Sequence, residues 1–412
     1  MRGTADDDAR IPSLPKHLRV AFLLPALHRS QNGQPVSAPA SIDPARHQAP
    51  ILGLLNLQLL FDIDIHGLDP VTTGNDRNRA SAPPPKSQED TPPVSTNLSR
   101  NSNEVLHLEE LELMMHWCTT TYRSMARDDA AEPLWQTVIP HLSLRHPALR
   151  HGLLALSALH LAKASGSPER KWRYMVSARE HQTRALAGIE LDEGQDLTTA
   201  QCNATFALCC VMITFAFGYC LIEGRDDTET DEQLDVLDEF LEIFQLTRWL
   251  VCVMIGLIDR ISAGELSPLV RPEQPSATMP DMSRLVILSL RRQNGIEGLR
   301  DPAHERDIYD QAIGHLGALL EQLMRGGEPK MFAFCWSFRI PYVFLDLVRR
   351  RRPFALIVLA HYAVVLYHLR DSWWMGDWGT RVLEQIGDCL DSEWRQHLSW
   401  PINATGCFLP ES

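Results

Sequence analysis

The stretch at 302–323 reads PAHERDIYDQAIGHLGALLEQL, and its apolar residues recur with the period of an α-helix. They form one stripe made of Ile308, Ala312, Leu316, Leu319, Leu320 and Leu323. Asp301 and Pro302 predict an N-cap and a first helical position, because proline lacks the N–H group that would be unpaired there anyway. Ser167-Pro168-Glu169 predicts another helix start, with a carboxylate in the first turn.

The same helical period continues through most of the chain beyond residue 104. Between residues 147 and 164 the pattern is carried by Leu149, Leu153, Leu156, His160 and Ala164. Alternating strands are not evident, and the Asn-Gly pairs at Asn32 and Asn294 lack flanking strand patterns. We therefore expect an all-α fold, with a single multi-helix domain over residues 104–400 and a tail at 401–412.

The chain before residue 104 has a different composition. Residues 1–65 hold two modest apolar runs without a clear period, so this region is poorly defined. Residues 66–103 contain six prolines, no aromatic residues and many Ser, Thr, Asn and Asp. Such a segment buries too little apolar surface to offset its ordering entropy, which predicts a disordered linker.

Charge and cysteine content exclude two classes of protein. The net charge of −13 over 412 residues argues against a surface that holds nucleic acid throughout by basic attraction. Nine cysteines, mostly inside apolar runs and without any C-x-x-C, indicate a reduced protein without a disulfide framework.

Residues 204–222 are 19 consecutive positions without a charge, long enough to span a bilayer. A central helix that is buried on all sides by its neighbours would give an uncharged run of the same length. The mean hydropathy of the chain is −0.17 and no basic cluster flanks either end, which favours the buried helix and no membrane span.

Signatures of catalysis and of metal binding are weak. Phosphate-binding loops, H-E-x-x-H and G-x-S-x-G are missing, so we expect no catalytic residues. Asp226, Asp227 and Asp231 are similar to the magnesium-binding aspartates of terpene cyclases but depart from their spacing, and an exposed acidic loop is the alternative. His141, His146 and His151 are five residues apart, about 140° on a helix, and cannot converge on a metal. We expect no metal ligands.

Two further features each have two interpretations. Arg349, Arg350, Arg351 and Arg352 form a candidate nuclear-import signal, or they complement a helix C-terminus before Pro353. The aromatic residues around them line an apolar pocket or pack in the core; the candidates for ligand binding are Trp336, Phe338, Trp373, Trp374 and Trp378. The uncharged helix 204–222 is a candidate wall of that pocket.

The segment 336–386 resembles the C-terminal regulatory domain of fungal binuclear zinc-cluster transcription factors, in particular the group of sterol uptake control proteins. The resemblance is carried by Pro341, by Arg352-Pro353, by the helix Ala355–Leu366, by Trp373-Trp374 and by Asp377-Trp378. A second block, 111–162, is similar to the start of that domain and includes HPALRHGLLALSALHLA at 146–162. Together the two blocks extend the resemblance over about residues 104–400.

The resemblance implies a nuclear regulator that is not an enzyme, and shuttling between cytoplasm and nucleus is the alternative localisation. It implies control of sterol, lipid or secondary-metabolite genes, a small apolar effector, and a homodimer or a heterodimer with other regulators. Two alternatives stay open, a membrane-associated helical protein and a magnesium-dependent terpenoid-type enzyme.

One departure concerns zinc. Family members hold two zinc ions with six N-terminal cysteine thiolates, and the first cysteine here is Cys118, inside the regulatory domain. We therefore expect no cofactor in this chain and contact with promoter DNA only indirectly or through a missing zinc-cluster segment. Two explanations are expected: the gene model has lost its first exon, or the protein is a truncated relative that acts through partners.

Overall fold

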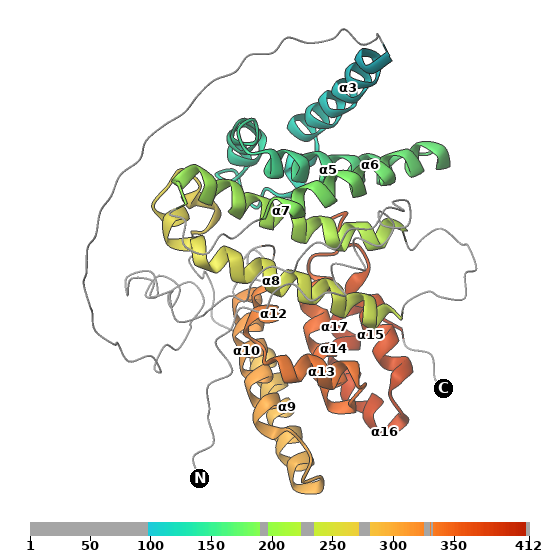
Figure 1. Cartoon of the computed structure of the whole chain (residues 1–412). Coiled ribbons are helices and arrows are strands. Elements are labelled where there is room, and N and C mark those ends of the chain that lie inside the picture. The colour runs from blue at the N-terminus through green and yellow to red at the C-terminus, as the bar shows by residue number, and fades with distance from the viewer. Residues whose placement is uncertain are drawn as a thin grey trace, which may run out of the picture.

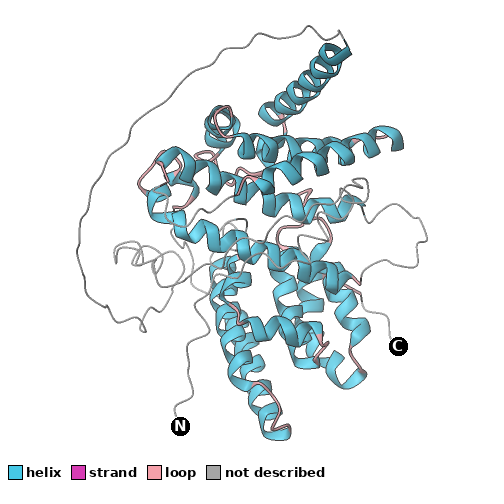
Figure 2. Ribbon diagram, in the orientation of Figure 1, coloured by secondary structure: helices cyan, strands magenta, loops and turns pink. Residues whose placement is uncertain are grey.

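A computed structural model describes residues 98–189, 197–223, 235–271, 281–324, 330 and 333–408, with side chains described from residue 108 and, in the helix that begins at Asp281, from residue 283. Helices and turns make up this part of the chain, and it contains no strand (Figure 2). The predicted all-α fold is confirmed. Residues 1–97, and with them the expectations for 1–65 and most of 66–103, lie outside the described residues, as do 409–412.

The first half of the described chain forms stacked helices (Figure 1). The elements are α3 (Leu98–Thr119), η2 (Thr121–Ser124), η3 (Leu134–Val138), α4 (Ile139–Ser143), α5 (Pro147–Ala164), α6 (Pro168–Ala187), α7 (Thr199–Glu223) and α8 (Val236–Ser262). Helices α5 and α6 pack as a hairpin, α5 also packs on α7, and α7 packs on α8. Helix α3 begins at Leu98, inside the segment expected to be linker.

The second half packs on the other side of α8 (Figure 1). Its elements are η4 (Ser267–Leu269), α9 (Asp281–Arg300), α10 (Arg306–Met324), α12 (Cys335–Arg339), α13 (Tyr342–Arg349), α14 (Pro353–Tyr367), α15 (Trp378–Cys389), α16 (Ser392–Arg395), η5 (Gln396–Leu398) and α17 (Ser399–Thr405). Helix α8 contacts α12, α13 and α15, and therefore joins the two halves.

Helix α7 is the central helix of the first half. Nearly all of its residues from Cys202 to Ile222 are buried, which accounts for the uncharged run at 204–222. By length and composition alone α7 and α8 are both apolar enough to cross a membrane, and the most apolar window of α7 is 89% buried within the protein. Gly152 of α5 allows close packing here, since a Cβ atom would lie 2.6 Å from Leu208 Cδ1.

Helix α14 has the same role in the second half. Its side chains from Phe354 to Leu366 are buried on every face, so it is surrounded by other helices. Helix α15 crosses α14 closely at Gly379, where a Cβ atom would lie 2.7 Å from the backbone nitrogen of Tyr367 and 2.8 Å from the carbonyl oxygen of Ala363. Only a glycine fits at such a distance from another backbone.

Two predicted helix starts have different outcomes. The start at Ser167-Pro168 is confirmed, because α6 begins at Pro168 with Ser167 as its N-cap. The start at Asp301-Pro302 is wrong, because α10 begins at Arg306. The chain must reverse direction after α9 ends at Arg300, and the Asp301 carboxylate instead accepts the N–H of Ala303 (2.8 Å) in that turn.

Candidate functional site

Trp336 and Trp378, two of the predicted ligand-binding residues, lie in the core. Trp336 is 1% exposed and donates its indole N–H to the Ala312 carbonyl oxygen (3.0 Å), which ties α12 to α10. Trp378 is fully buried and donates to the Phe217 carbonyl oxygen (3.1 Å), which ties α15 to α7. Phe338 is half-buried on α12 and packs against the core.

Trp373 and Trp374 lie between α14 and α15 and face the first half of the domain. The indole N–H of Trp373 donates to Ser124 Oγ (2.6 Å), and its ring stacks on His160 with centroids 4.7 Å apart. Burial, with His116 and Lys163 nearby, lowers the pKa of His160 to about 4, so that imidazole is neutral at neutral pH. Trp374 is buried, and its indole nitrogen has no hydrogen-bond partner within the described part of the chain.

A cavity of about 150 Å³ lies between α7 and α8, and Trp374 closes one side of it. Helix α7 contributes Phe206, Cys210, Ile213 and Thr214 to its walls; α8 contributes Val251, Met254, Ile255 and Ile258. The segment 204–222 therefore lines a cavity, whereas Trp374 is the one residue of the five predicted aromatic residues that does so.

The rim of the cavity carries two cations. Arg127 donates to the carbonyl oxygens of Pro268 (2.6 Å) and Arg271 (3.1 Å), and Lys330 donates to that of Ala126 (3.1 Å). Burial raises the pKa of the lining thiols Cys210 and Cys335 to about 12, so neither is a thiolate. Arg127 Nε also lies 3.2 Å from Asp128 Oδ2. The cavity thus combines uncharged, mostly apolar walls with an edge that carries the Arg127–Asp128 ion pair and Lys330.

The four arginines of the basic stretch are not equivalent. Arg349, Arg350 and Arg352 are exposed, and Arg349 pairs with Asp346 (2.8 Å) on its own helix. Arg351 is half-buried and has a positive φ of 52°, a conformation that few residues other than glycine adopt. Its Nη2 atom lies 3.0 Å from Asp235 Oδ2 and 2.9 Å from Asp238 Oδ1, at the N-terminal end of α8.

The structure describes the three histidines but not the three aspartates of the acidic stretch. Asp226, Asp227 and Asp231 lie outside the described residues. Of the three histidines, His151 lies beside His181 of α6 rather than beside His141 or His146. Sequence analysis did not identify His181, because a lone histidine in a polar amphipathic helix gives no signal of its own.

Sequence analysis also missed most of the residues that line the cavity, and the pattern explains why. Val251, Met254, Ile255 and Ile258 follow the i, i+3, i+4, i+7 spacing of any buried helix face. A wall of a cavity and a well-packed core contact have the same pattern, so the sequence carries no signal that separates them.

Comparison with known proteins bears on the family that this chain resembles. Residues 112–234 match the fungal specific transcription factor domain. The chain is 24% identical to a Zn(2)-C6 fungal-type transcription factor of Gibberella zeae over 323 residues, 74% of this chain and 64% of that protein. It is 31% identical to Sterol uptake control protein 2 of Saccharomyces cerevisiae over 105 residues, 25% of this chain and 11% of the relative.

A similar match, 31% over 72 residues, is found to Sterol uptake control protein 2 of Candida albicans, 10% of which is covered. The chain thus spans less than two thirds of the first relative and about a tenth of the other two. The resemblance inferred from the two sequence blocks is confirmed.

Proposed function

Since this chain carries a fungal specific transcription factor domain and resembles the zinc-cluster regulators, we propose that it regulates transcription in the nucleus without being an enzyme. Its helical domain binds a small apolar effector and dimerises. By analogy with the sterol uptake control proteins, the genes it controls belong to sterol, lipid or secondary metabolism. The observation that carries the effector proposal is the cavity between α7 and α8.

The chemistry of the cavity restricts the effector. Apolar walls favour a hydrophobic molecule, because binding removes its apolar surface and that of the walls from water. The edge of the cavity, which carries Lys330 and the Arg127–Asp128 ion pair, favours a hydroxyl or carboxyl group at one end of that molecule. Sterols, fatty acids and polyketides meet both conditions.

The size of the cavity restricts the mode of binding. A cavity of about 150 Å³ takes a benzene-sized molecule, and larger ligands occupy about 300–1,000 Å³. A sterol therefore enters only if the cavity widens, which requires α8 or the segment around Leu269 to move away from α7. Such widening gives the effector a means of changing the conformation of the domain.

Helix α8 connects this movement to the basic stretch. Ile255 lines the cavity, and Asp238, about 26 Å away along the same helix, pairs with Arg351. A shift of α8 changes the distance between its N-terminal carboxylates and Arg351. In this proposal the paired Arg351 belongs to the state without import. Release of the pair frees Arg351 to join the exposed Arg349, Arg350 and Arg352 as an import signal.

The effector is tested by thermal unfolding of the full chain with sterols, fatty acids and polyketides. We expect at least one class to raise the unfolding midpoint, because a ligand bound to the folded state stabilises it by mass action. Ile213→Phe, which fills the cavity from α7, is expected to abolish that rise. Leu221→Phe is the matched control, since Leu221 has the same low exposure on the same helix but lies outside this cavity.

Two results contradict the effector proposal: no compound raises the midpoint, or Ile213→Phe responds like the parent protein. Dimerisation is tested separately by light scattering of the purified chain, where a monomer at micromolar concentration contradicts it. Localisation is tested by imaging the tagged chain with and without Arg349–Arg352 replaced by alanine, and equal nuclear signal contradicts the import role.

A further inference from the structure

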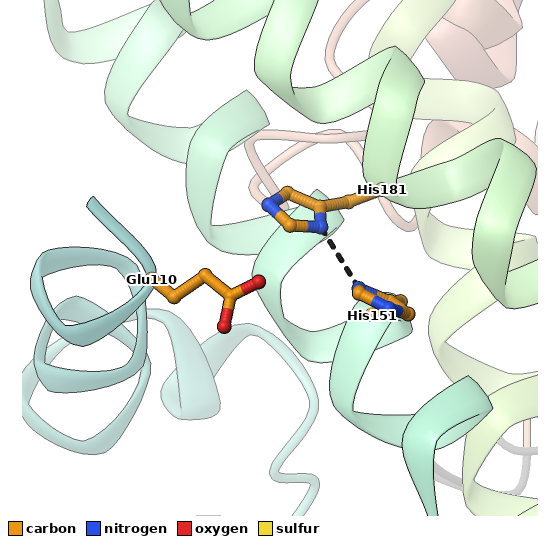
Figure 3. A group of neighbouring side chains, drawn as sticks. All are labelled: Glu110, His151 and His181. Atoms are coloured by element: carbon orange, nitrogen blue, oxygen red, sulfur yellow. Dashed lines mark hydrogen bonds between the residues drawn. The ribbon is translucent and has the colours of Figure 1, made fainter. Parts of the chain in front are cut away.

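Three side chains from three different helices converge at the open end of the α5–α6 hairpin. They are Glu110 of α3, His151 of α5 and His181 of α6 (Figure 3). One ligand atom from each, a carboxylate oxygen or an imidazole nitrogen, lies within 4.8 Å of the other two. In Figure 3 the Glu110 carboxylate points toward the pair of imidazole rings.

The geometry of the two histidines is close to that of a shared metal ion. Their Nδ1 atoms are 3.0 Å apart and their rings are stacked with centroids 5.1 Å apart. Two imidazole nitrogens bound to one tetrahedral zinc ion at about 2.0–2.1 Å are about 3.3–3.4 Å apart. A small opening of the pair thus admits an ion in place of the shared proton, and rotation of the flexible Glu110 side chain supplies the third ligand.

The protonation states also suit metal binding. Burial, together with His151, Arg184 and Arg150, lowers the pKa of His181 to about 4, and burial likewise lowers the pKa of His151. Both rings are therefore neutral at neutral pH, the form in which imidazole binds a metal. Glu110 and Glu180 provide negative charge nearby, while Arg184 pairs with Glu180.

The donor set indicates which class of ion fits. Two imidazoles and one carboxylate suit zinc and neighbouring transition metals, whereas calcium and magnesium need mainly oxygen ligands. The positive charges of Arg150 and Arg184 oppose any cation, which further favours ions that bind imidazole strongly. Cysteine is not part of the group, so this site is distinct from a thiolate cluster.

We propose that Glu110, His151 and His181 bind a transition-metal ion of the zinc class and thereby fix α3 to the α5–α6 hairpin. The structure gives this clamp a mechanical role. Buried Leu113 and Trp117 anchor one face of α3 near its C-terminal end, whereas Leu108 and Leu111, which precede them, are 67% and 60% exposed. Besides the proposed ligands, the bond from Tyr174 to Glu112 (2.9 Å) is a polar contact between α3 and α6.

The test is a zinc titration of the untagged full chain after treatment with a chelator, followed by calorimetry. We expect one ion per chain at micromolar Zn²⁺. His151→Gln, His181→Gln and Glu110→Gln are each expected to weaken binding by more than about tenfold, since even changes in the surroundings of metal ligands cost about 10–100-fold. His146→Gln is the matched control, a half-buried histidine at the N-cap of α5 that lies outside the group, and it is expected to bind like the parent.

A second measurement keeps the test informative if a buried variant folds poorly. Cobalt added in place of zinc is expected to give the visible spectrum of a nitrogen and oxygen site without the charge-transfer band of thiolate ligands. Failure to bind one ion, a thiolate band, or variants that bind like the parent overturns the site. Loss of binding in the histidine variants but not in Glu110→Gln overturns the clamp between α3 and the hairpin.

Discussion

Replacement of Trp378 by phenylalanine tests whether Trp378 is a core residue or a ligand-binding residue. Trp378 is fully buried, donates one hydrogen bond to the Phe217 carbonyl oxygen (3.1 Å), and packs edge-to-face on Phe217 with ring centroids 6.0 Å apart. Loss of the hydrogen bond costs about 1 kcal/mol. The space left by the smaller ring costs roughly 1–2 kcal/mol more. We therefore expect Trp378→Phe to lower the free energy of unfolding by about 2–3 kcal/mol.

The assay is equilibrium unfolding in urea followed by circular dichroism, with the thermal response to apolar compounds measured in parallel. Trp172→Phe is the control, because Trp172 is 70% exposed on α6 and its replacement is expected to change stability by less than about 0.5 kcal/mol. Trp378→Phe is expected to keep the response to the effector, since Trp378 does not line the cavity. Equal stability of the two variants, or loss of the effector response in Trp378→Phe, refutes the assignment of Trp378 to the core.

Three further predictions follow from other parts of the fold. Arg351→Ala is expected to destabilise the domain by about 1 kcal/mol or less and Arg350→Ala hardly at all, because Arg351 pairs with Asp235 and Asp238 at the start of α8; equal urea midpoints contradict this. Burial lowers the pKa of His361 to about 4 in the folded state, so protons bind preferentially to the unfolded state. The free energy of unfolding should therefore fall as the pH drops from about 6.5 toward 4, and an unfolding midpoint that stays constant over this range contradicts the burial of His361. Gly379→Ala is expected to lower the free energy of unfolding by about 1–3 kcal/mol, because the new Cβ atom meets the backbone of α14. Gly256→Ala on α8, where nothing lies within 4 Å of the new Cβ atom, is the control and should raise that free energy by up to about 1 kcal/mol. Thermal midpoints that move in the same direction in both variants contradict the close approach of α15 to α14.

Local pattern was sufficient for the elements whose apolar residues repeat over several turns. The helical stripe at 302–323 and the uncharged run at 204–222 predicted a helix and a buried helix, and α10 and α7 are those helices. Helical period and burial are properties of neighbouring residues, so the sequence specifies them without knowledge of the rest of the fold. The exact start of α10 was missed because it depends on the turn from α9, which involves Asn294 and its bond to the Arg306 carbonyl oxygen (2.9 Å).

Only the tertiary structure decided which aromatic residue faces a cavity and which arginine is paired. Trp374 and Trp378 are four residues apart, yet Trp374 lines the cavity, whereas Trp378 begins α15 and packs in the core against Phe217 of α7. Arg351 meets Asp235 across 116 positions of sequence, and His151 meets His181 because α5 and α6 fold back on each other. These contacts join residues that are distant in the chain, and a sequence read one segment at a time determines which face of each helix is apolar but not which other helix that face meets.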